Sequence, residues 1–67
     1  MNKFPERLKE LRIEKNLSQE DLAKQINMTQ SGIAKWETGV NSPSIDILIM
    51  LAKFFDCTID YLVGYSD

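Results

Sequence analysis

Helical spacing of the apolar residues is the feature that most constrains how this chain folds. Apolar side chains recur three and four residues apart, as at Phe4, Leu8 and Leu11, and no stretch alternates apolar and polar residues as a strand does. Residue types that cap helix starts stand at Ser18, Thr29, Ser44 and Thr58. Residue types that tolerate the left-handed backbone of a helix end stand at Asn16, Asn27, Gly39 and Gly64.

These signals together predict an all-α domain of five short helices. We expect them at about residues 3–15, 19–26, 29–38, 45–55 and 59–63. The segment Ser18-Gln19-Glu20-Asp21 is a variant of the capping box, in which Ser18 and Asp21 bond to each other's backbone amides. The fourth segment is the most apolar, which favours a central position for it.

The length and composition exclude several classes of protein. A chain of 67 residues makes one domain, residues 1–67, and its single cysteine, Cys57, cannot form an internal disulfide. Because the chain has no histidine, neither a Cys/His zinc site nor a cysteine–histidine catalytic pair is available, so we expect no metal, no cofactor and no enzymatic activity. Cys57 is interpreted as a small apolar filler.

Neither a membrane nor a strongly basic surface is indicated. The longest apolar run, Ile47 to Ala52, is far shorter than a bilayer span, and the polar N-terminus does not resemble a signal peptide, so we expect a cytoplasmic protein. The net charge is −2. Residues 1–43 carry seven basic and six acidic side chains, whereas residues 44–67 carry one and four. Charge alone therefore argues against a strongly basic nucleic-acid binder.

The segment from Gln19 to Thr38 has the pattern of a helix-turn-helix. It predicts two helices joined by a short turn at Asn27 and Met28. The apolar residues that would set the helix crossing are Leu22, Ile26, Met28, Ile33 and Trp36, with the small Ala23 at the close approach. Trp36 is assigned to the core rather than to base stacking because it lies three residues after Ile33. In this motif the second helix, residues 29–38 here, lies in the major groove of DNA.

Motifs along nearly the whole chain resemble those of a known family. RLKELR at residues 7–12, LSQEDLA at 17–23, T-x3-I-x2-W-E-x-G at 29–39 with a proline at 43, and LAKFF with IDYLVG at 51–55 and 59–64 are similar to the Cro/C1-type (XRE-like) helix-turn-helix family of phage repressors and bacterial transcriptional regulators. The resemblance implies a lambda-repressor-like domain of five helices, encoded by a prokaryote or phage. It also implies a homodimer bound to a near-palindromic double-stranded operator, with a repressor as the preferred interpretation.

The resemblance also assigns roles to individual residues. It places base contacts at Gln30, Ser31 and Lys35, and contacts to the DNA backbone at Gln19, Thr29, Thr38 and Asn41. The chemistry agrees, because glutamine pairs with adenine N6 and N7, lysine donates to guanine O6 and N7, and serine donates or accepts. The amides at the starts of the second and third helices can bind phosphates without a lysine. The alternative is that Gln30, Ser31 and Lys35 form an ordinary solvated face.

Three further assignments have explicit alternatives. Arg12 is expected to pair with Glu37, as the resemblance implies, rather than to contact a phosphate. Tyr61, Leu62 and Tyr65 are expected either to form a dimer interface or, for Tyr61 and Leu62, to close the core. The charged residues of the first helix, Arg7 among them, are interpreted mainly as a solvated face.

Two features depart from the family pattern. The loop Val40-Asn41-Ser42 lacks the usual cations, and Gly32 replaces a side chain often found on the base-contacting face. Few cations predict modest affinity for each domain and a shallow dependence on salt. The competing functional class is a protein-interaction module, such as an antitoxin or a partner of another regulator.

Overall fold

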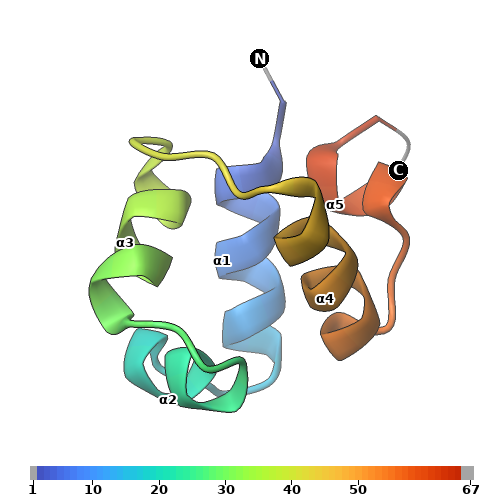
Figure 1. The fold of residues 1–67 in the computed structure, drawn as a ribbon. Helices are drawn as coiled ribbons and strands as arrows, with labels where there is room; N and C mark the ends of the chain where they lie inside the picture. Colours follow the sequence, from blue (N-terminus) through green and yellow to red (C-terminus); the bar gives the residue numbers. More distant parts are fainter. Residues whose placement is uncertain (1, 66–67) are drawn as a thin grey trace.

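The computed structural model describes residues 2–65, and these form five α-helices and no strand. The helices are α1 (Phe4–Glu14), α2 (Gln19–Gln25), α3 (Gln30–Thr38), α4 (Ile45–Phe55) and α5 (Ile59–Val63) (Figure 1). The predicted all-α architecture is confirmed, and each boundary lies within one residue of its expected position. None of the helices in the described residues has the length and hydropathy needed to cross a bilayer.

Helix caps explain why the boundaries follow so directly from the sequence. The four predicted capping hydroxyls each accept a hydrogen bond from the amide three residues later, at Asp21, Gly32, Ile47 and Tyr61. Four predicted stop residues, Asn16, Asn27, Gly39 and Gly64, have positive φ angles. Asp56 also has a positive φ, 55°, and ends α4. Aspartate is one of the few residues with a side chain that tolerates this conformation, but its signal in the sequence is weak.

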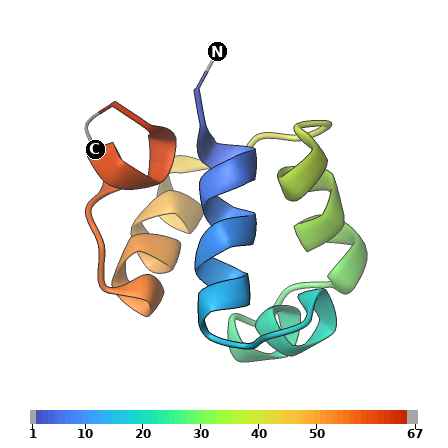
Figure 2. The ribbon, with the colours of Figure 1, turned by 180° about the vertical axis from the view of Figure 1, so that it is seen from behind.

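The central helix is α1, so the expectation that residues 45–55 would be central is wrong. Both ribbon views place α1 between α3 on one side and the α4–α5 pair on the other (Figures 1 and 2). Helix α4 buries Leu51, Ala52 and Phe55, but Ile45 is 70% exposed and Ile49 is 39% exposed. The number of apolar residues in α4 does not indicate a central position. They lie around most of the helix circumference, and only one side of the helix packs against the rest of the domain.

Most of the described chain shares one hydrophobic core. Five large side chains are 0% exposed, one from each helix: Leu8 of α1, Leu22 of α2, Ile33 of α3, Leu51 of α4 and Leu62 of α5. Trp36 packs edge-on against Phe4, with ring centroids 6.5 Å apart. Each helix therefore supplies at least one fully buried residue, and the position of α3 depends on the packing of the other four.

Arg7 corrects the expectation of a solvated charged face on the first helix. It is only 9% exposed, its Nη1 donates to the Tyr61 carbonyl oxygen at 3.1 Å, and its guanidinium carbon lies 4.2 Å from the Tyr61 ring centroid. The Lys3 amide also donates to the Val63 carbonyl oxygen at 2.9 Å. Arg7 therefore connects α1 to α5, a role that spacing along one helix does not show.

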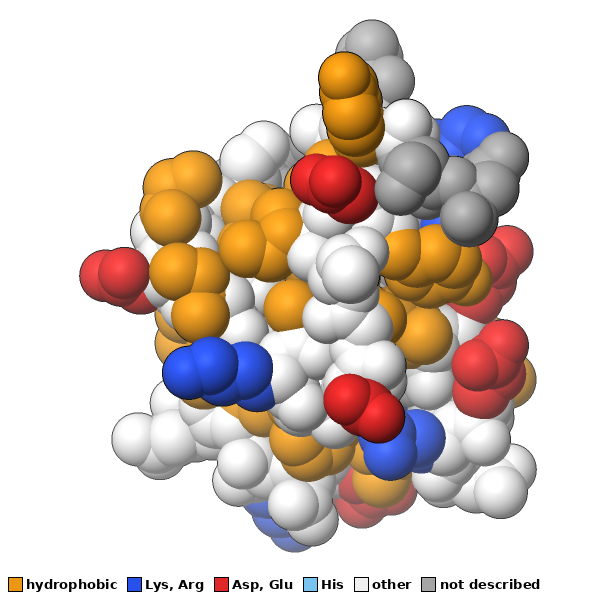
Figure 3. Space-filling view, turned by 90° about the vertical axis from the view of Figure 1, so that its right-hand side faces the viewer, with side chains coloured by type: hydrophobic (Ala, Val, Ile, Leu, Met, Phe, Trp, Pro, Cys, Tyr) orange, Lys and Arg blue, Asp and Glu red, His pale blue; other side chains and the backbone are white. Residues whose placement is uncertain are grey.

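Surface-exposed apolar residues are concentrated after α3. The large exposed ones are Val40, Ile45, Ile49, Ile59 and Tyr65, with Ile13 on α1. Figure 3 faces the α4–α5 side and shows apolar side chains at the surface there, with acidic groups among them. Cys57 is half-buried against the core, and burial, followed by the charge of Asp56, raises the pKa of its thiol. This environment suits its interpretation as an apolar filler.

Candidate nucleic-acid interface

Helices α2 and α3 form the predicted helix-turn-helix. Asn27 has φ of 59°, and the Met28 amide donates to the Ala23 carbonyl oxygen at 2.8 Å, which closes the turn. Ala23 is buried and lets the two helices approach closely. Leu22, Ile26, Ile33 and Trp36 are also buried, and Met28 packs against them half-buried. The assignment of Trp36 to the core is thus confirmed.

The opposite face of α3 is polar and open to solvent. Gln30, Ser31 and Lys35 are exposed, and so are Thr29, Thr38 and Asn41 around them. Ala34, which sequence reasoning did not single out, is half-buried between Gln30 and Thr38 on the same side of the helix. Its methyl group is of the kind that contacts the thymine methyl in a major groove. The sequence could have identified Ala34 as part of this face, because it lies four residues after Gln30 and four before Thr38.

Gly32 lies in the first turn of α3, where Thr29 caps the helix. Its amide donates to Thr29 Oγ1 at 3.1 Å, and a Cβ atom at position 32 would lie 3.2 Å from the same oxygen. Such a contact is tighter than usual, so the missing side chain leaves room for the cap. This local role accounts for a glycine inside a helix without reference to DNA.

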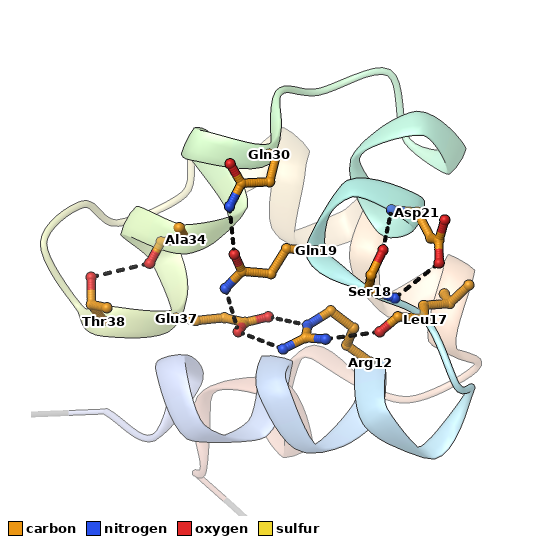
Figure 4. A network of polar contacts seen from close by, with 9 residues as sticks. All are labelled: Arg12, Leu17, Ser18, Gln19, Asp21, Gln30, Ala34, Glu37 and Thr38. Carbon is orange, nitrogen blue, oxygen red and sulfur yellow. Dashed lines mark hydrogen bonds and ion pairs between the residues drawn. The ribbon is translucent and has the colours of Figure 1, made fainter.

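A chain of hydrogen bonds connects the exposed Gln30 to a buried ion pair (Figure 4). Arg12 Nε donates to Glu37 Oε2 at 2.6 Å, and Arg12 Nη2 donates to Glu37 Oε1 at 3.0 Å. Gln19 Nε2 donates to Glu37 Oε1 at 3.1 Å. Gln30 Nε2 then donates to Gln19 Oε1 at 2.6 Å. We call these four residues, Arg12, Glu37, Gln19 and Gln30, the glutamine relay.

The buried end of the glutamine relay is the ion pair that the family resemblance implied. The side chains of Arg12 and Glu37 are 11% and 3% exposed, and Arg12 Nη1 also donates to the Leu17 carbonyl oxygen at 2.8 Å. The hydrogen bond to Glu37, with the attraction of its charge, raises the pKa of Arg12 in spite of its burial. Arg12 is therefore engaged within the protein, which leaves the alternative of a phosphate contact without support.

The residues expected at the DNA backbone have different surroundings. Gln19 is half-buried and bonded on both sides within the relay. Thr38 Oγ1 lies 3.1 Å from the Ala34 carbonyl oxygen, to which it donates, so its hydroxyl hydrogen is used within α3 (Figure 4). Asn41 is exposed in the loop after α3. Its backbone N–H donates to the Lys35 carbonyl oxygen at 3.3 Å, so its side chain takes no part in this bond.

The two helix starts also differ in charge. The first turn of α2 carries Glu20 and Asp21, whereas the first turn of α3 has no acidic residue. The Ser18 backbone amide donates to Asp21 Oδ2 at 3.1 Å. This hydrogen bond, followed by the one with the Ser18 side chain, lowers the pKa of Asp21. Carboxylates already occupy the positive end of the α2 dipole, so the start of α3 is the better place for a phosphate.

The three residues expected at a dimer interface are in three different environments. Leu62 is 0% exposed, so it cannot contact a second protein and takes the alternative role, closing the core. Tyr61 is half-buried, with Arg7 against its ring. Tyr65 is 84% exposed and is the only one of the three that is freely accessible.

Comparison with known proteins agrees with this geometry. Residues 8–62 match the model of the helix-turn-helix family. The chain belongs to this family. The match spans all of α2 and α3 and most of the core that supports them.

The relatives of this helix-turn-helix chain are transcriptional regulators. It is 44% identical over 61 residues to the HTH-type transcriptional activator BcrR of Enterococcus faecalis, covering 91% of this chain and 30% of BcrR. It is 33% identical over 64 residues to the cryptic phage CTXphi transcriptional repressor RstR of Vibrio cholerae, covering 96% of this chain and 58% of RstR. The resemblance to phage repressors and bacterial regulators is confirmed, and the relatives are regulators rather than enzymes.

A solved structure shows the same fold. A transcriptional regulator from Listeria innocua superposes with a TM-score of 0.90 at 34% sequence identity, over 100% of this chain and 63% of that one. This chain also spans 57% of the regulator YobD of Bacillus subtilis. The chain therefore corresponds to the DNA-binding domain of a helix-turn-helix transcriptional regulator, and it spans about half the length, or less, of the first relatives that it matches.

Proposed function

We propose that this chain binds a specific sequence of double-stranded DNA with α3 in the major groove, as a repressor in the cytoplasm of a prokaryote or a phage host. The observation that carries the proposal is the exposed polar row Gln30, Ser31 and Lys35 on the outer face of α3. Its backbone is held by the buried Ile33 and Trp36. A helix that is fixed on one side and polar on the other suits recognition of base edges.

Each residue of the row has a matching partner in DNA. The Gln30 amide can pair with adenine N6 and N7, and the Lys35 ammonium can donate to guanine O6 and N7. The Ser31 hydroxyl can either donate to or accept from a base edge. The backbone contacts that we propose come from Thr29, Asn41 and the second Nε2 hydrogen of Gln19, together with the amides at the start of α3. Thr38 joins them when its hydroxyl turns from the Ala34 carbonyl oxygen to a phosphate. These contacts orient the helix and carry little sequence information.

Repression is the simpler mode of regulation for the surfaces that the structure describes. Occupying an operator needs only the DNA-binding face, whereas activation needs a further contact with the transcription machinery. BcrR is named an activator and RstR a repressor, so a reporter assay with the operator overlapping the promoter separates the two modes. Reporter output that falls when the protein is expressed supports repression, and output that rises overturns it.

Selection from a random duplex pool tests sequence-specific binding. We expect one motif to be enriched at low salt, and the double variant Gln30→Ala/Lys35→Ala to lose that motif while keeping the circular dichroism spectrum of a helical protein. Lys9→Ala is the matched control, because it removes an exposed lysine from α1. A pool with no enriched sequence overturns the proposal and favours a protein-interaction module.

We further propose that the protein binds a near-palindromic operator as a homodimer through the outer face of α4. This face carries the exposed Ile45 and Ile49, and it lies across α1 from α3 (Figures 1 and 2). Asp46 and Lys53 lie almost symmetrically about Ile49 and are both exposed. In an antiparallel pair of α4 helices, Asp46 of one copy therefore meets Lys53 of the other, which makes the surface complementary to itself.

This arrangement leaves both α3 helices free. Two such helices must lie about 34 Å apart to enter successive major grooves on one side of DNA. Tyr65, exposed after α5, adds an aromatic side chain on the α4–α5 half of the molecule.

Sedimentation with and without the selected operator tests the dimer. Ile49→Glu is expected to give a monomer that binds half-sites only, whereas Ile13→Glu, the matched change at an exposed isoleucine of α1, leaves the dimer intact. Asp46→Lys is expected to weaken the dimer, and Asp46→Lys/Lys53→Asp to restore it. A dimer that persists in Ile49→Glu overturns α4 as the interface.

A further inference from the structure

We propose that Glu37 is a positioning residue for base recognition, because it fixes, through Gln19, which end of the Gln30 amide faces the DNA. This inference rests on the proposed function, since it assumes that Gln30 meets a base. It gives the buried ion pair of the glutamine relay a second role besides holding α1 against α3.

Glu37 sets the direction because an ionised carboxylate only accepts hydrogen bonds. Each of its oxygens accepts a hydrogen bond from an Arg12 nitrogen, at 2.6 and 3.0 Å. Its side chain is 3% exposed. Within this pair the guanidinium of Arg12 lies against both carboxylate oxygens and balances their charge. Any amide that approaches Glu37 Oε1 must therefore turn its nitrogen toward it.

Gln19 passes this direction on to Gln30. Its Nε2 donates to Glu37 Oε1 at 3.1 Å, so its Oε1 points the other way and can only accept. Gln30 Nε2 donates a hydrogen bond to this oxygen, Gln19 Oε1, at 2.6 Å. Each amide has two chemically different ends, and the carboxylate decides the orientation of both (Figure 4).

Gln30 is then left with a defined pair of groups for DNA. One hydrogen of its Nε2 is used by Gln19, so the second hydrogen and the carbonyl oxygen Oε1 remain. A donor beside an acceptor is the pattern that adenine N7 and N6 require. A free glutamine on a helix surface rotates between both orientations, and binding must then also overcome the entropy of fixing it. The relay removes part of that entropy before DNA arrives.

The substitution Glu37→Gln tests the direction of the relay with almost no change in shape. A glutamine at position 37 can keep its oxygen at the place of Oε2, bonded to Arg12 Nε, and turn its nitrogen to Gln19. The hydrogen bond from Arg12 Nη2 is then lost, and both amides reverse. We expect the preference for adenine at one base pair of each half-site to fall about tenfold, since a good bidentate contact supplies discrimination of that order. The preferences at the other positions of the motif are expected to stay as in the wild type.

A double variant provides the rescue. In Glu37→Gln/Gln19→Glu, the nitrogen of residue 37 donates to the carboxylate at position 19, and the other oxygen of that carboxylate accepts from Gln30 Nε2. The original orientation of Gln30 returns, so the adenine preference is expected to return as well. A merely structural role for Glu37 does not predict this recovery. The control is Glu6→Gln, the same chemical change at an exposed glutamate of α1.

Two measurements keep this inference separate from the proposed function. NMR of the free protein is expected to show a Gln30 side-chain amide hydrogen slowed in exchange in the wild type and the double variant, but not in Glu37→Gln. Motif selection with each variant, after circular dichroism has shown that it is folded, then gives the base preference. A wild type that enriches no motif overturns the proposed function and this inference with it. An enriched motif whose adenine preference survives Glu37→Gln, or an unprotected Gln30 amide in the wild type, overturns this inference alone.

Discussion

Helices α3 and α4 lie on opposite sides of α1 and are built by the same local rules, yet their outer faces differ. A hydroxyl residue caps each start, Thr29 or Ser44, and a residue with positive φ ends each helix, Gly39 or Asp56. The outer face of α3 is polar, whereas that of α4 exposes Ile45 and Ile49. Caps therefore determine where a helix lies in the chain, and the outward residues determine what it can bind.

Charge sharpens the same contrast. The described part of the α4–α5 half carries the acidic Asp46, Asp56 and Asp60 against one basic residue, Lys53, so its net negative charge disfavours phosphates. Residues 1–43 carry seven basic and six acidic side chains and are close to neutral. Orientation on DNA can thus come from repulsion at one side of the molecule as well as from contacts at the other.

The largest expected effect is on the buried ion pair of the α3 side. Glu37→Ala leaves the Arg12 charge without its partner, and we expect a loss of about 3–5 kcal/mol in the free energy of unfolding. Urea denaturation measures this loss. The matched change on the α4 side is Asp46→Ala, at an exposed residue, where we expect little change in a monomeric background. Equal losses in both variants would remove the contrast between the two sides.

A second prediction separates core from interface within the α4–α5 half. Leu62→Ala removes a fully buried side chain and is expected to lower the free energy of unfolding by about 2–5 kcal/mol. Tyr65→Ala alters an exposed residue and is expected to leave the stability of the monomer almost unchanged. Thermal and urea unfolding at low protein concentration measure both. A stable Leu62→Ala monomer that no longer dimerises would reinstate Leu62 as an interface residue.

The third prediction distinguishes the two kinds of DNA contact on the α3 side. Lys35→Ala is expected to relax the preference at one base pair by about 1–3 kcal/mol if its ammonium group meets a guanine. A lysine that meets a phosphate instead weakens binding to all sequences and lowers the salt slope by about one. Binding titrations of matched and mismatched duplexes at several salt concentrations tell these outcomes apart.

Helix caps give a smaller effect that α3 and α4 should share. Thr29→Ala and Ser44→Ala each remove the acceptor for one amide of the first turn, and we expect a loss of about 1 kcal/mol from each. Chemical denaturation of the two variants side by side provides the comparison. Unequal losses would show that the two helices differ in more than their outer faces.

The smallest effect concerns pH at the cap of α2. The pKa of Asp21 is lowered in the folded protein, so its contribution to stability is present above the ordinary aspartate pKa, about 3.9, and is lost as the pH falls through the lowered folded value. Asp21→Asn is therefore expected to be less stable than the wild type at neutral pH, and the difference should shrink in acid. A difference that is independent of pH contradicts the charged capping box.

Much of the candidate site was predictable because it depends on local rules. Helical spacing places Gln30, Ser31 and Lys35 opposite Ile33 and Trp36, and the structure has them on opposite faces. The ion pair of Arg12 with Glu37 came from the family resemblance rather than from spacing, since 25 residues separate the two. The link from Glu37 through Gln19 to Gln30 was not anticipated, because it joins side chains of two different helices.

By itself the sequence determined the five helices, their caps and stops, and the division of α3 into a packed and an exposed face. All of these follow from interactions between residues at most four positions apart. Only the tertiary structure decided that α1 is the central helix, that Arg7 and Leu62 are buried, and that one carboxylate connects to the exposed Gln30. Those features depend on how helices cross, and a crossing is set by the packing of distant side chains rather than by the spacing of near ones.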